Sequence, residues 1–227
     1  MKLLALFCLL APFLSWLIHA SCNVQSTLYL RYFCRKRTRQ REVILTFDDG
    51  PDPLQTPQVL RVLRAHGAPA CFFCIGSKIK GNEGLLRQMV ADGHLVGIHS
   101  YTHSSFFPFY RLSTMKKELQ ACQNEIERVT SQPVRLFRPP FGVTNPTVAK
   151  AVRQLGYSPI GWSIRTLDTC TGNRQKVLDR VRKGLCPGAV ILLHDRLPGS
   201  DQLLEEIFQI LDQRGYTVVP LNQPVAE

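Results

Sequence analysis

After residue 42 the chain alternates short apolar runs with longer segments in which apolar residues recur at helical spacing. The apolar runs predict buried strands at 43–47, 70–75, 94–99, 134–137, 158–164, 189–193 and 216–219. The segments between them predict helices at 57–66, 83–92, 113–130, 146–155, 174–184 and 201–214. Strand and helix in strict alternation imply an α/β fold built on a parallel sheet.

The number of predicted strands favours closure of that sheet into a barrel, with an open doubly wound sheet as the alternative. A chain of 227 residues, 44% hydrophobic and 20% charged, is long enough for one large core. Ser113 and Asn145 are predicted N-caps, and Pro146 takes the first helical position after Asn145. Glycines stand where helix C-termini are expected, at positions 67, 93, 156 and 215.

Residues 1–41 differ in composition from the rest of the chain. They hold seven basic and no acidic side chains, so +7 of the net charge of +11 lies there, and 21 basic against 17 acidic residues leave +4 elsewhere. This near balance argues against nucleic-acid binding by the folded part. The apolar segment 3–18, followed by a basic run, predicts an exported precursor or an uncleaved membrane anchor, with Ala20 closing a possible cleavage site. We therefore predict two parts, a signal or anchor segment with its basic juxtamembrane stretch at 1–41, and one folded domain at 42–227.

The eight cysteines form no clear disulfide framework. Cys71 and Cys74 have the spacing of a redox pair, but they lie within a predicted buried strand, where free cysteine packs as a small apolar residue. We interpret both as core residues. A disulfide between Cys170 and Cys186 remains open.

Side chains that can take part in acid–base chemistry or metal binding lie at or just after the ends of the predicted strands. They are Asp48, Asp49, His99, Arg138, Asp168, His194 and Asp195. In a parallel barrel these strand ends open on one face, where active sites are built.

Asp48 and Asp49 precede a Gly-Pro turn, so either could simply bond the local backbone. His99 and His103, taken alone, could be one core histidine and one solvated neighbour. Together on adjacent strand ends, the pairs favour a metal site of two imidazoles and one carboxylate, with a second carboxylate free for proton transfer. His66 and His94 lack such neighbours, and we interpret them as structural.

Five segments, in order, resemble the motifs of the polysaccharide deacetylases, which are carbohydrate esterase family 4 and carry the NodB homology domain. The segments are Thr46-Phe-Asp-Asp-Gly50, His99-Ser-Tyr-Thr-His103, Arg138-Pro-Pro-Phe-Gly142, Trp162-Ser-Ile-Arg-Thr-Leu-Asp168 and Leu192-Leu-His-Asp195. The similarity spans about residues 42–222. It implies a single domain with a distorted (β/α)7/8, TIM-barrel-like fold and metal-dependent removal of acetyl groups from glycans.

The resemblance assigns a metal-binding role to Asp49, His99 and His103, with zinc the usual ion. Cobalt, nickel or iron would suit the same ligands. Asp48 would act as the general base on an attacking water, because a carboxylate committed to the cation is a poorer base. A backbone N–H of the loop at 138–142 would stabilise the oxyanion.

The remaining roles also follow from the resemblance. His194 would donate a proton to the departing amine, and Asp168 would hold it as an imidazolium, while Arg138 would hold Asp48 ionised. The substrate-binding residues would be Phe141, Trp162, Leu193 and Arg165.

The fourth motif departs from the family pattern. Many members carry an acid where Arg165 stands and a tryptophan where Thr169 stands. Loss of the tryptophan removes an apolar wall of the sugar pocket. Arg165 would either pair with Asp168 or meet an anionic substrate.

We therefore expect an extracytoplasmic hydrolase of carbon–nitrogen, non-peptide bonds that acts on acetylated polysaccharide or oligosaccharide. Its substrates would be N-acetylglucosamine units of peptidoglycan or chitin type. Three alternatives remain open: a non-catalytic glycan-binding protein of the same fold, an O-acetyl esterase acting on xylan, and a basic membrane-anchored scaffold that binds anionic polymer or lipid.

Overall fold

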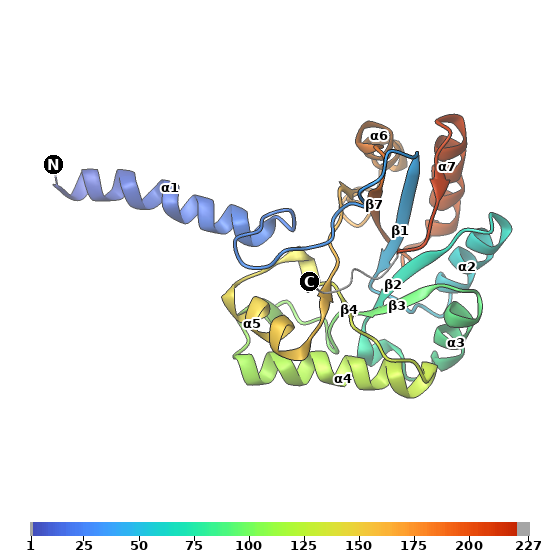
Figure 1. The fold of residues 1–227 in the computed structure, drawn as a ribbon, viewed down its shortest axis with the longest axis horizontal. Coiled ribbons are helices and arrows are strands. Elements are labelled where there is room, and N and C mark those ends of the chain that lie inside the picture. The colour runs from blue at the N-terminus through green and yellow to red at the C-terminus, as the bar shows by residue number, and fades with distance from the viewer. Residues whose placement is uncertain (1, 222–227) are drawn as a thin grey trace.

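The computed structural model describes residues 2–221, with side chains described from residue 12 onward. Its centre is one parallel sheet with the order β5-β4-β3-β2-β1-β7-β6, and β8 pairs with the start of β1 (Figure 1). The strands are β1 (Glu42–Asp48), β2 (Ala70–Cys74), β3 (Leu95–Ile98), β4 (Leu136–Phe137), β5 (Ser158–Pro159), β6 (Ile164–Arg165), β7 (Ala189–His194) and β8 (Thr217–Val218). The strand β1 lies between β2 and β7, so the sheet curls as in a barrel, and the fold is the predicted distorted (β/α) barrel.

Helices cover the outside of the curled sheet (Figure 1). They are α2 (Thr56–Ala65), α3 (Glu83–Ala91), α4 (Leu112–Thr130), α5 (Pro146–Leu155), α6 (Arg174–Gly184) and α7 (Ser200–Gln213). Short 3-10 turns are η1 (Gly76–Lys78), η2 (Phe107–Phe109) and η3 (Pro140–Gly142). The inner strands β1, β2 and β7 are buried almost throughout, because helices and neighbouring strands cover both of their faces.

The predicted helix ends are mostly confirmed. The Asn145 side chain accepts a hydrogen bond from the Val148 N–H, with Pro146 at the first helical position. All four predicted C-terminal glycines have positive φ, the conformation that glycine adopts without steric cost. The prediction for Ser113 was wrong, because α4 already begins at Leu112 and Arg111 is its N-cap.

The strand predicted at 158–164 is interrupted, and only its two ends are strands, β5 and β6. The reason lies in the backbone between them. The carbonyls of Ile160 and Gly161 accept hydrogen bonds from Nε and Nη2 of Arg138, at 3.2 and 2.8 Å. A carbonyl that faces a guanidinium does not extend a strand ladder, so the sheet has a gap between β5 and β6.

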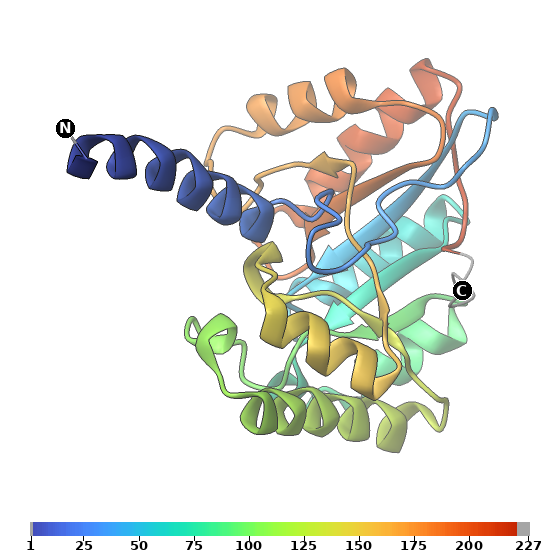
Figure 2. The same cartoon turned by 60° about the vertical axis from the view of Figure 1, so that its left-hand side comes forward.

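The helix α1 (Lys2–Cys22) projects away from the body, and residues 21–36 then return across it toward β1 (Figure 2). Tyr32, Leu30 and Val24 from this segment are buried. Within the part of the chain that the structure describes, no helix combines the length and the apolar character that a membrane span requires. The division of the chain at residue 42 stays a prediction.

Candidate active site

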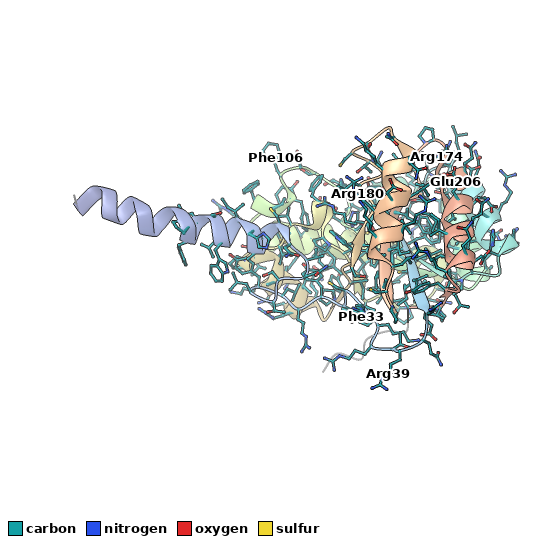
Figure 3. All side chains as sticks on the ribbon, turned by 90° about the horizontal axis from the view of Figure 1, so that it is seen from above. Phe33, Arg39, Phe106, Arg174, Arg180 and Glu206 are labelled. Atoms are coloured by element: carbon teal, nitrogen blue, oxygen red, sulfur yellow. The ribbon has the colours of Figure 1, made fainter. Side chains whose placement is uncertain are left out.

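A pocket of about 240 Å³ lies at the carboxyl ends of the strands. Its wall is built from the strand ends and the loops that follow them, and it contains Asp48, Asp49, His99, His103, Phe141, Gly142, Trp162, Arg165, Leu167, Thr169, Cys170, Leu192, His194 and Arg196. In Figure 3, Phe106, which follows β3, and Arg39, which precedes β1, lie on opposite sides of the molecule. Of the seven polar residues predicted at the strand ends, four line this pocket, namely Asp48, Asp49, His99 and His194.

Asp49, His99 and His103 form the group that could hold a metal ion in the part of the chain that the structure describes. One potential ligand atom from each lies within 4.8 Å of the others. The Oδ1 atom of Asp49 is 3.4 Å from Nε2 of His99 and 3.2 Å from Nε2 of His103. These three atoms converge on one point, as a two-imidazole, one-carboxylate site requires.

The local environment prepares each ligand for a cation. His99 donates from Nδ1 to the Arg138 carbonyl at 2.8 Å, which leaves the Nε2 lone pair directed at the cluster. Burial, and then the neighbouring His99, lower the pKa of His103 to about 4, so its imidazole is neutral near pH 7. Burial raises the pKa of Asp49, but hydrogen bonding to His99 and the nearby histidines outweigh it and place that pKa well below its ordinary range. The residues present fit a divalent cation.

Arg196 holds the other oxygen of the Asp49 carboxylate. Its Nε donates to Oδ2 of Asp49 at 2.9 Å. Because Oδ1 faces the two histidines and Oδ2 faces the guanidinium, the carboxylate has one oxygen left for a cation. This contact favours monodentate ligation by Asp49.

Asp48 is the second carboxylate of the pair, and a buried arginine holds it. Nη1 of Arg138 donates to Oδ1 of Asp48 at 2.7 Å and to Oγ1 of Thr46 at 2.9 Å. Arg138 is fully buried, and its guanidinium lies 4.2 Å from the centroid of the Phe73 ring. The second oxygen, Oδ2, lies 3.9 Å from Nε2 of His99, beside the metal-ligating group.

His194 ends β7 on the other side of the group. Its Nδ1 lies 2.8 Å from Oδ1 of Asp168, and its backbone N–H donates to Oδ2 of the same carboxylate at 2.9 Å. Burial opposes the imidazolium, but the bond to Asp168 and the charges of Asp48 and Asp49 raise the pKa of His194 above its ordinary value. The raised pKa suits the ring to proton donation, and its Nε2 edge faces the pocket, 3.9 Å from Oδ2 of Asp49.

Residues 35–160 match a protein-family model described as "Polysaccharide deacetylase". The chain belongs to the polysaccharide deacetylase family. A chitooligosaccharide deacetylase of Sinorhizobium fredii is 36% identical over 195 residues, covering 86% of this chain and 89% of the relative. The peptidoglycan-N-acetylmuramic acid deacetylase PdaA of Bacillus subtilis is 31% identical over 194 residues, covering 84% and 73%.

A solved structure that resembles this family member is a carbohydrate esterase family 4 pseudoenzyme from Bacillus anthracis. It superimposes with a TM-score of 0.75 at 28% identity, covering 82% of this chain and 66% of that one. A mutant of the same protein with restored enzymatic activity superimposes equally well, with a TM-score of 0.75. The fold alone therefore does not distinguish an active deacetylase from an inactive relative.

Of the four residues predicted to bind substrate, three line the pocket and one does not. Phe141, Trp162 and Arg165 line the pocket, and the Phe141 ring lies 4.7 Å from the His103 ring, centroid to centroid. Leu193 is buried and does not line the pocket, whereas its neighbour Leu192 does. Successive side chains of a strand point to opposite faces, so a shift of one residue changes which leucine meets the pocket.

Arg165 does not pair with Asp168. Both Asp168 oxygens are occupied by His194, and Oδ1 also accepts from the Thr166 hydroxyl. The Arg165 guanidinium lies 5.6 Å from the Trp162 ring centroid. No carboxylate of the described residues lies within ion-pair distance of it, and Arg165 lines the pocket.

Sequence reasoning missed Arg196, Leu167 and Cys170 as pocket residues. For Arg196 a signal existed, since it follows His194 and Asp195 at the end of a predicted strand. Leu167 and Cys170 lie beside Asp168 in an irregular loop, where no periodicity indicates which side chains face inward.

Several residues around the pocket have backbone conformations that are unfavourable for side chains other than glycine. Asp49, His103, Phe141 and Leu167 have φ values of 73, 52, 61 and 58°. Such a backbone conformation costs on the order of 1 kcal/mol of folding free energy per residue, and it persists where the surrounding structure fixes it. All four line the pocket, so the loops aim these side chains at a local energetic cost.

Asp195, which follows His194, serves a different purpose from its neighbour. It is completely buried and accepts a hydrogen bond from the Thr56 hydroxyl, while its Oδ1 has no partner among the described residues. A Cβ added to Gly50 would lie 2.3 Å from Oδ2 of Asp195. The glycine of the first motif is thus required by the close approach of this carboxyl group.

The remaining histidines and the two strand cysteines lie outside the pocket. His66 stacks on Phe208, and His94 accepts a hydrogen bond from the Ala70 N–H through Nδ1. Cys71 and Cys74 are fully buried free thiols in β2, which confirms them as core residues. Cys170 and Cys186 are also free thiols in this structure.

Proposed function

We propose that the protein is a metal-dependent hydrolase that removes acetyl groups from N-acetylated glycans and releases acetate. The observation that carries the proposal is the single pocket in which Asp49, His99 and His103 converge between Asp48 and His194. A cation site flanked by one carboxylate and one imidazole on separate strands is suited to hydrolysis with separate base and acid. The relatives named as chitooligosaccharide and peptidoglycan deacetylases support the same reaction.

In this proposal Asp49, His99 and His103 hold the ion, which is most often zinc for such ligands. A bound divalent ion supplies Lewis acidity that polarises an amide carbonyl and makes water more acidic. Arg196 contributes by fixing Oδ2 of Asp49, so that Oδ1 keeps its direction toward the two imidazoles. The choice among zinc, cobalt, nickel and iron depends on availability as well as on geometry.

Asp48 takes the proton of the attacking water. It is adjacent to the ligand group but is not one of the three convergent ligands, so a lone pair stays available for proton transfer. The bond from Nη1 of Arg138 at 2.7 Å fixes the carboxylate orientation, and the other guanidinium nitrogens are anchored on the Ile160 and Gly161 carbonyls. Arg138 is thus a positioning residue for the base.

His194 gives a proton to the departing amine. An amide nitrogen leaves poorly unless it is protonated, so the reaction needs an acid opposite the base. The Asp168 carboxylate holds Nδ1 and thereby leaves Nε2 as the donor toward the pocket. Trp162, Phe141 and Leu192 give the acetyl methyl and sugar ring an apolar wall, and a backbone N–H of the loop at 138–142 stabilises the developing oxyanion.

We propose that the enzyme acts outside the cytoplasm, on peptidoglycan-type or chitin-type polymers containing N-acetylglucosamine. The relatives named as peptidoglycan deacetylases support this location. Separation of periplasmic or cell-surface material from cytoplasm, followed by immunodetection of the native chain, tests it. Detection only in the cytoplasmic fraction would contradict it.

The function is tested by acetate release from acetylated chitooligosaccharides, peptidoglycan fragments and acetylated xylan, with and without a chelator. We expect Asp48→Asn to lower kcat by at least about a hundredfold. The Asp48→Asn variant should still bind zinc, as measured by competition with a chromophoric chelator. The control is Asp201→Asn, which removes an acid from the first turn of α7, outside the pocket.

Each outcome discriminates between the candidate functions. Acetate from xylan alone favours the O-acetyl esterase. Glycan binding without acetate release favours a non-catalytic protein, the reading that the pseudoenzyme neighbour and the altered fourth motif support. Acetate release that is insensitive to both the chelator and Asp48→Asn would refute the proposed mechanism.

A further inference from the structure

The gap in the barrel between β5 and β6 is filled by the chain N-terminal to the barrel. We call residues 21–36 the N-terminal strap. Phe33 forms a parallel bridge with Ile160, beside β5, and Arg35 forms an antiparallel bridge with Ala189 at the start of β7. The Phe33 N–H donates to the Pro159 carbonyl, and the Gly161 N–H donates to the Phe33 carbonyl, both at 3.0 Å. The strap therefore replaces a strand where the barrel is incomplete.

The strap also contacts the loop that follows β4 and leads into α5. The Thr144 N–H donates to the Ser21 carbonyl at 2.8 Å, and the Tyr32 hydroxyl bonds to the Thr144 hydroxyl. Both Tyr32 and Thr144 are buried. This loop carries Phe141, which lines the pocket, so the strap holds the loop through residues that do not themselves line the pocket.

A third set of contacts lies behind Trp162. A Cβ added to Gly161 would lie 2.5 Å from Sγ of Cys34 and 3.3 Å from Cγ2 of Val24, so the strap packs directly on the Gly161 backbone. Gln25 also donates from Nε2 to the Trp162 carbonyl at 3.5 Å. The strap therefore sets the position of the backbone from which the Trp162 side chain enters the pocket.

These contacts continue to the base through one arginine. The Gly161 N–H, which donates to the Phe33 carbonyl, belongs to the same peptide group as the Ile160 carbonyl, and that carbonyl and the next one, of Gly161, accept from Arg138. Arg138 in turn bonds to Asp48 at 2.7 Å. A displacement of the strap is thus transmitted to the proposed base through three successive hydrogen bonds.

We propose that the N-terminal strap is a positioning element of the active site, which sets Arg138, Trp162 and the Phe141 loop in their working geometry. This inference rests on the proposed deacetylase function for its kinetic readout only. The strap residues do not touch the reacting atoms. They act through the residues that line the pocket.

The decisive variant is Gly161→Ala in the full chain. The added methyl would meet Cys34 Sγ, and Gly161 has no positive φ that would itself disfavour alanine. We expect kcat for acetate release to fall by about ten- to a hundredfold, because small displacements behind a site have such effects. The double variant Cys34→Ala/Gly161→Ala removes the sulfur that meets the methyl, and should recover kcat to within about threefold of the parent chain.

Two controls separate positioning from loss of folding. Gly84→Ala adds a methyl in open space on α3, and should leave kcat unchanged. Far-ultraviolet circular dichroism at the assay temperature establishes that each variant is folded. Tyr32→Phe, which removes one hydroxyl from the contact with Thr144, is a milder probe and should lower kcat several-fold without loss of structure.

An independent readout is amide hydrogen exchange of the segments 139–144 and 159–163, followed by mass spectrometry. We expect faster exchange in Gly161→Ala and recovery in the double variant. Unchanged exchange, or a loss of kcat that Cys34→Ala does not relieve, would overturn the strap proposal. If the parent chain releases no acetate, the function proposal fails, and hydrogen exchange alone decides whether the strap orders these loops.

Discussion

At the scale of single residues, the pKa values of Asp195 and its neighbour His194 are both raised, but for different reasons. Burial raises the pKa of the Asp195 carboxyl to about 7, despite the hydrogen bond from Thr56. Burial lowers the pKa of His194, but the hydrogen bond to Asp168 and the charges of the neighbouring carboxylates outweigh burial and raise that pKa. Two adjacent residues at one strand end thus have different surroundings: His194, the proposed proton donor, faces the pocket, and Asp195 packs closely against Gly50.

The raised pKa of Asp195 predicts a stability effect with a definite sign. Because the folded-state pKa lies above the unfolded value of about 3.9, the carboxyl's contribution is fully present at low pH and is lost as pH rises through about 7. Asp195→Asn cannot titrate. Its Tm relative to the parent chain should therefore increase between about pH 4 and pH 7 and then level off. A Tm difference that is constant across that window would contradict the assignment.

Arg165 gives a prediction about substrate choice. Its guanidinium lines the pocket without a carboxylate partner among the described residues. If it meets an acidic sugar substituent, Arg165→Ala should lower kcat/KM for carboxylate-bearing glycans by roughly tenfold and leave neutral glycans nearly unaffected. Arg180→Ala, on α6 (Figure 3), is the matched control. Equal changes in kcat/KM on both substrate classes would show that Arg165 does not determine substrate specificity.

At the scale of elements, two helix N-caps provide a matched pair. Asn145 and Asn173 each accept a backbone hydrogen bond at the start of a helix, α5 and α6. Replacement of either by alanine should lower the free energy of unfolding by about 1 kcal/mol. Only Asn145 also donates from Nδ2 to the Pro108 carbonyl, at 2.6 Å, between the η2 turn and the loop that carries Phe141.

We therefore expect Asn145→Ala, but not Asn173→Ala, to lower kcat for acetate release as well as stability. Urea unfolding and steady-state kinetics on both variants measure the two effects. Equal activity in the two variants would show that the Asn145 contact has no influence on the pocket.

Local sequence patterns predicted most helices and the central strands because their periodicity and end residues agree with the fold. The helix at 146–155 is an example, with its asparagine cap, proline and terminal glycine. Local patterns did not reveal the interruption at 160–163, because its cause is Arg138, which is distant in sequence. The same limit applies to the strap, whose composition resembles a juxtamembrane stretch but whose bonds reach residues 144, 160 and 189.

At the scale of the whole molecule, metal binding should be linked to folding. The three proposed ligands come from the ends of β1 and β3 and the loop beyond, so they converge only in the folded chain. A ligand at a hundred times its Kd adds about 2.7 kcal/mol to stability. Zinc should therefore raise the Tm of the parent chain.

His103→Ala should abolish this zinc-dependent increase. His66→Gln removes a histidine that stacks on Phe208, far from the ligand group in the fold, and should retain the increase. Differential scanning calorimetry with and without zinc provides the measurement. An equal zinc effect in both variants would place the ion elsewhere.

The incomplete barrel also affects how the protein can be prepared. The stretch that matches the family model begins at residue 35, after most of the segment that covers the gap beside β5. A recombinant fragment trimmed to that start would present bare N–H and C=O groups along an open flank, and such flanks recruit strands from other molecules. A fragment trimmed in this way should aggregate into inclusion bodies. A fragment that starts at Ser21 retains the N-terminal strap, whose backbone pairs with the open flank.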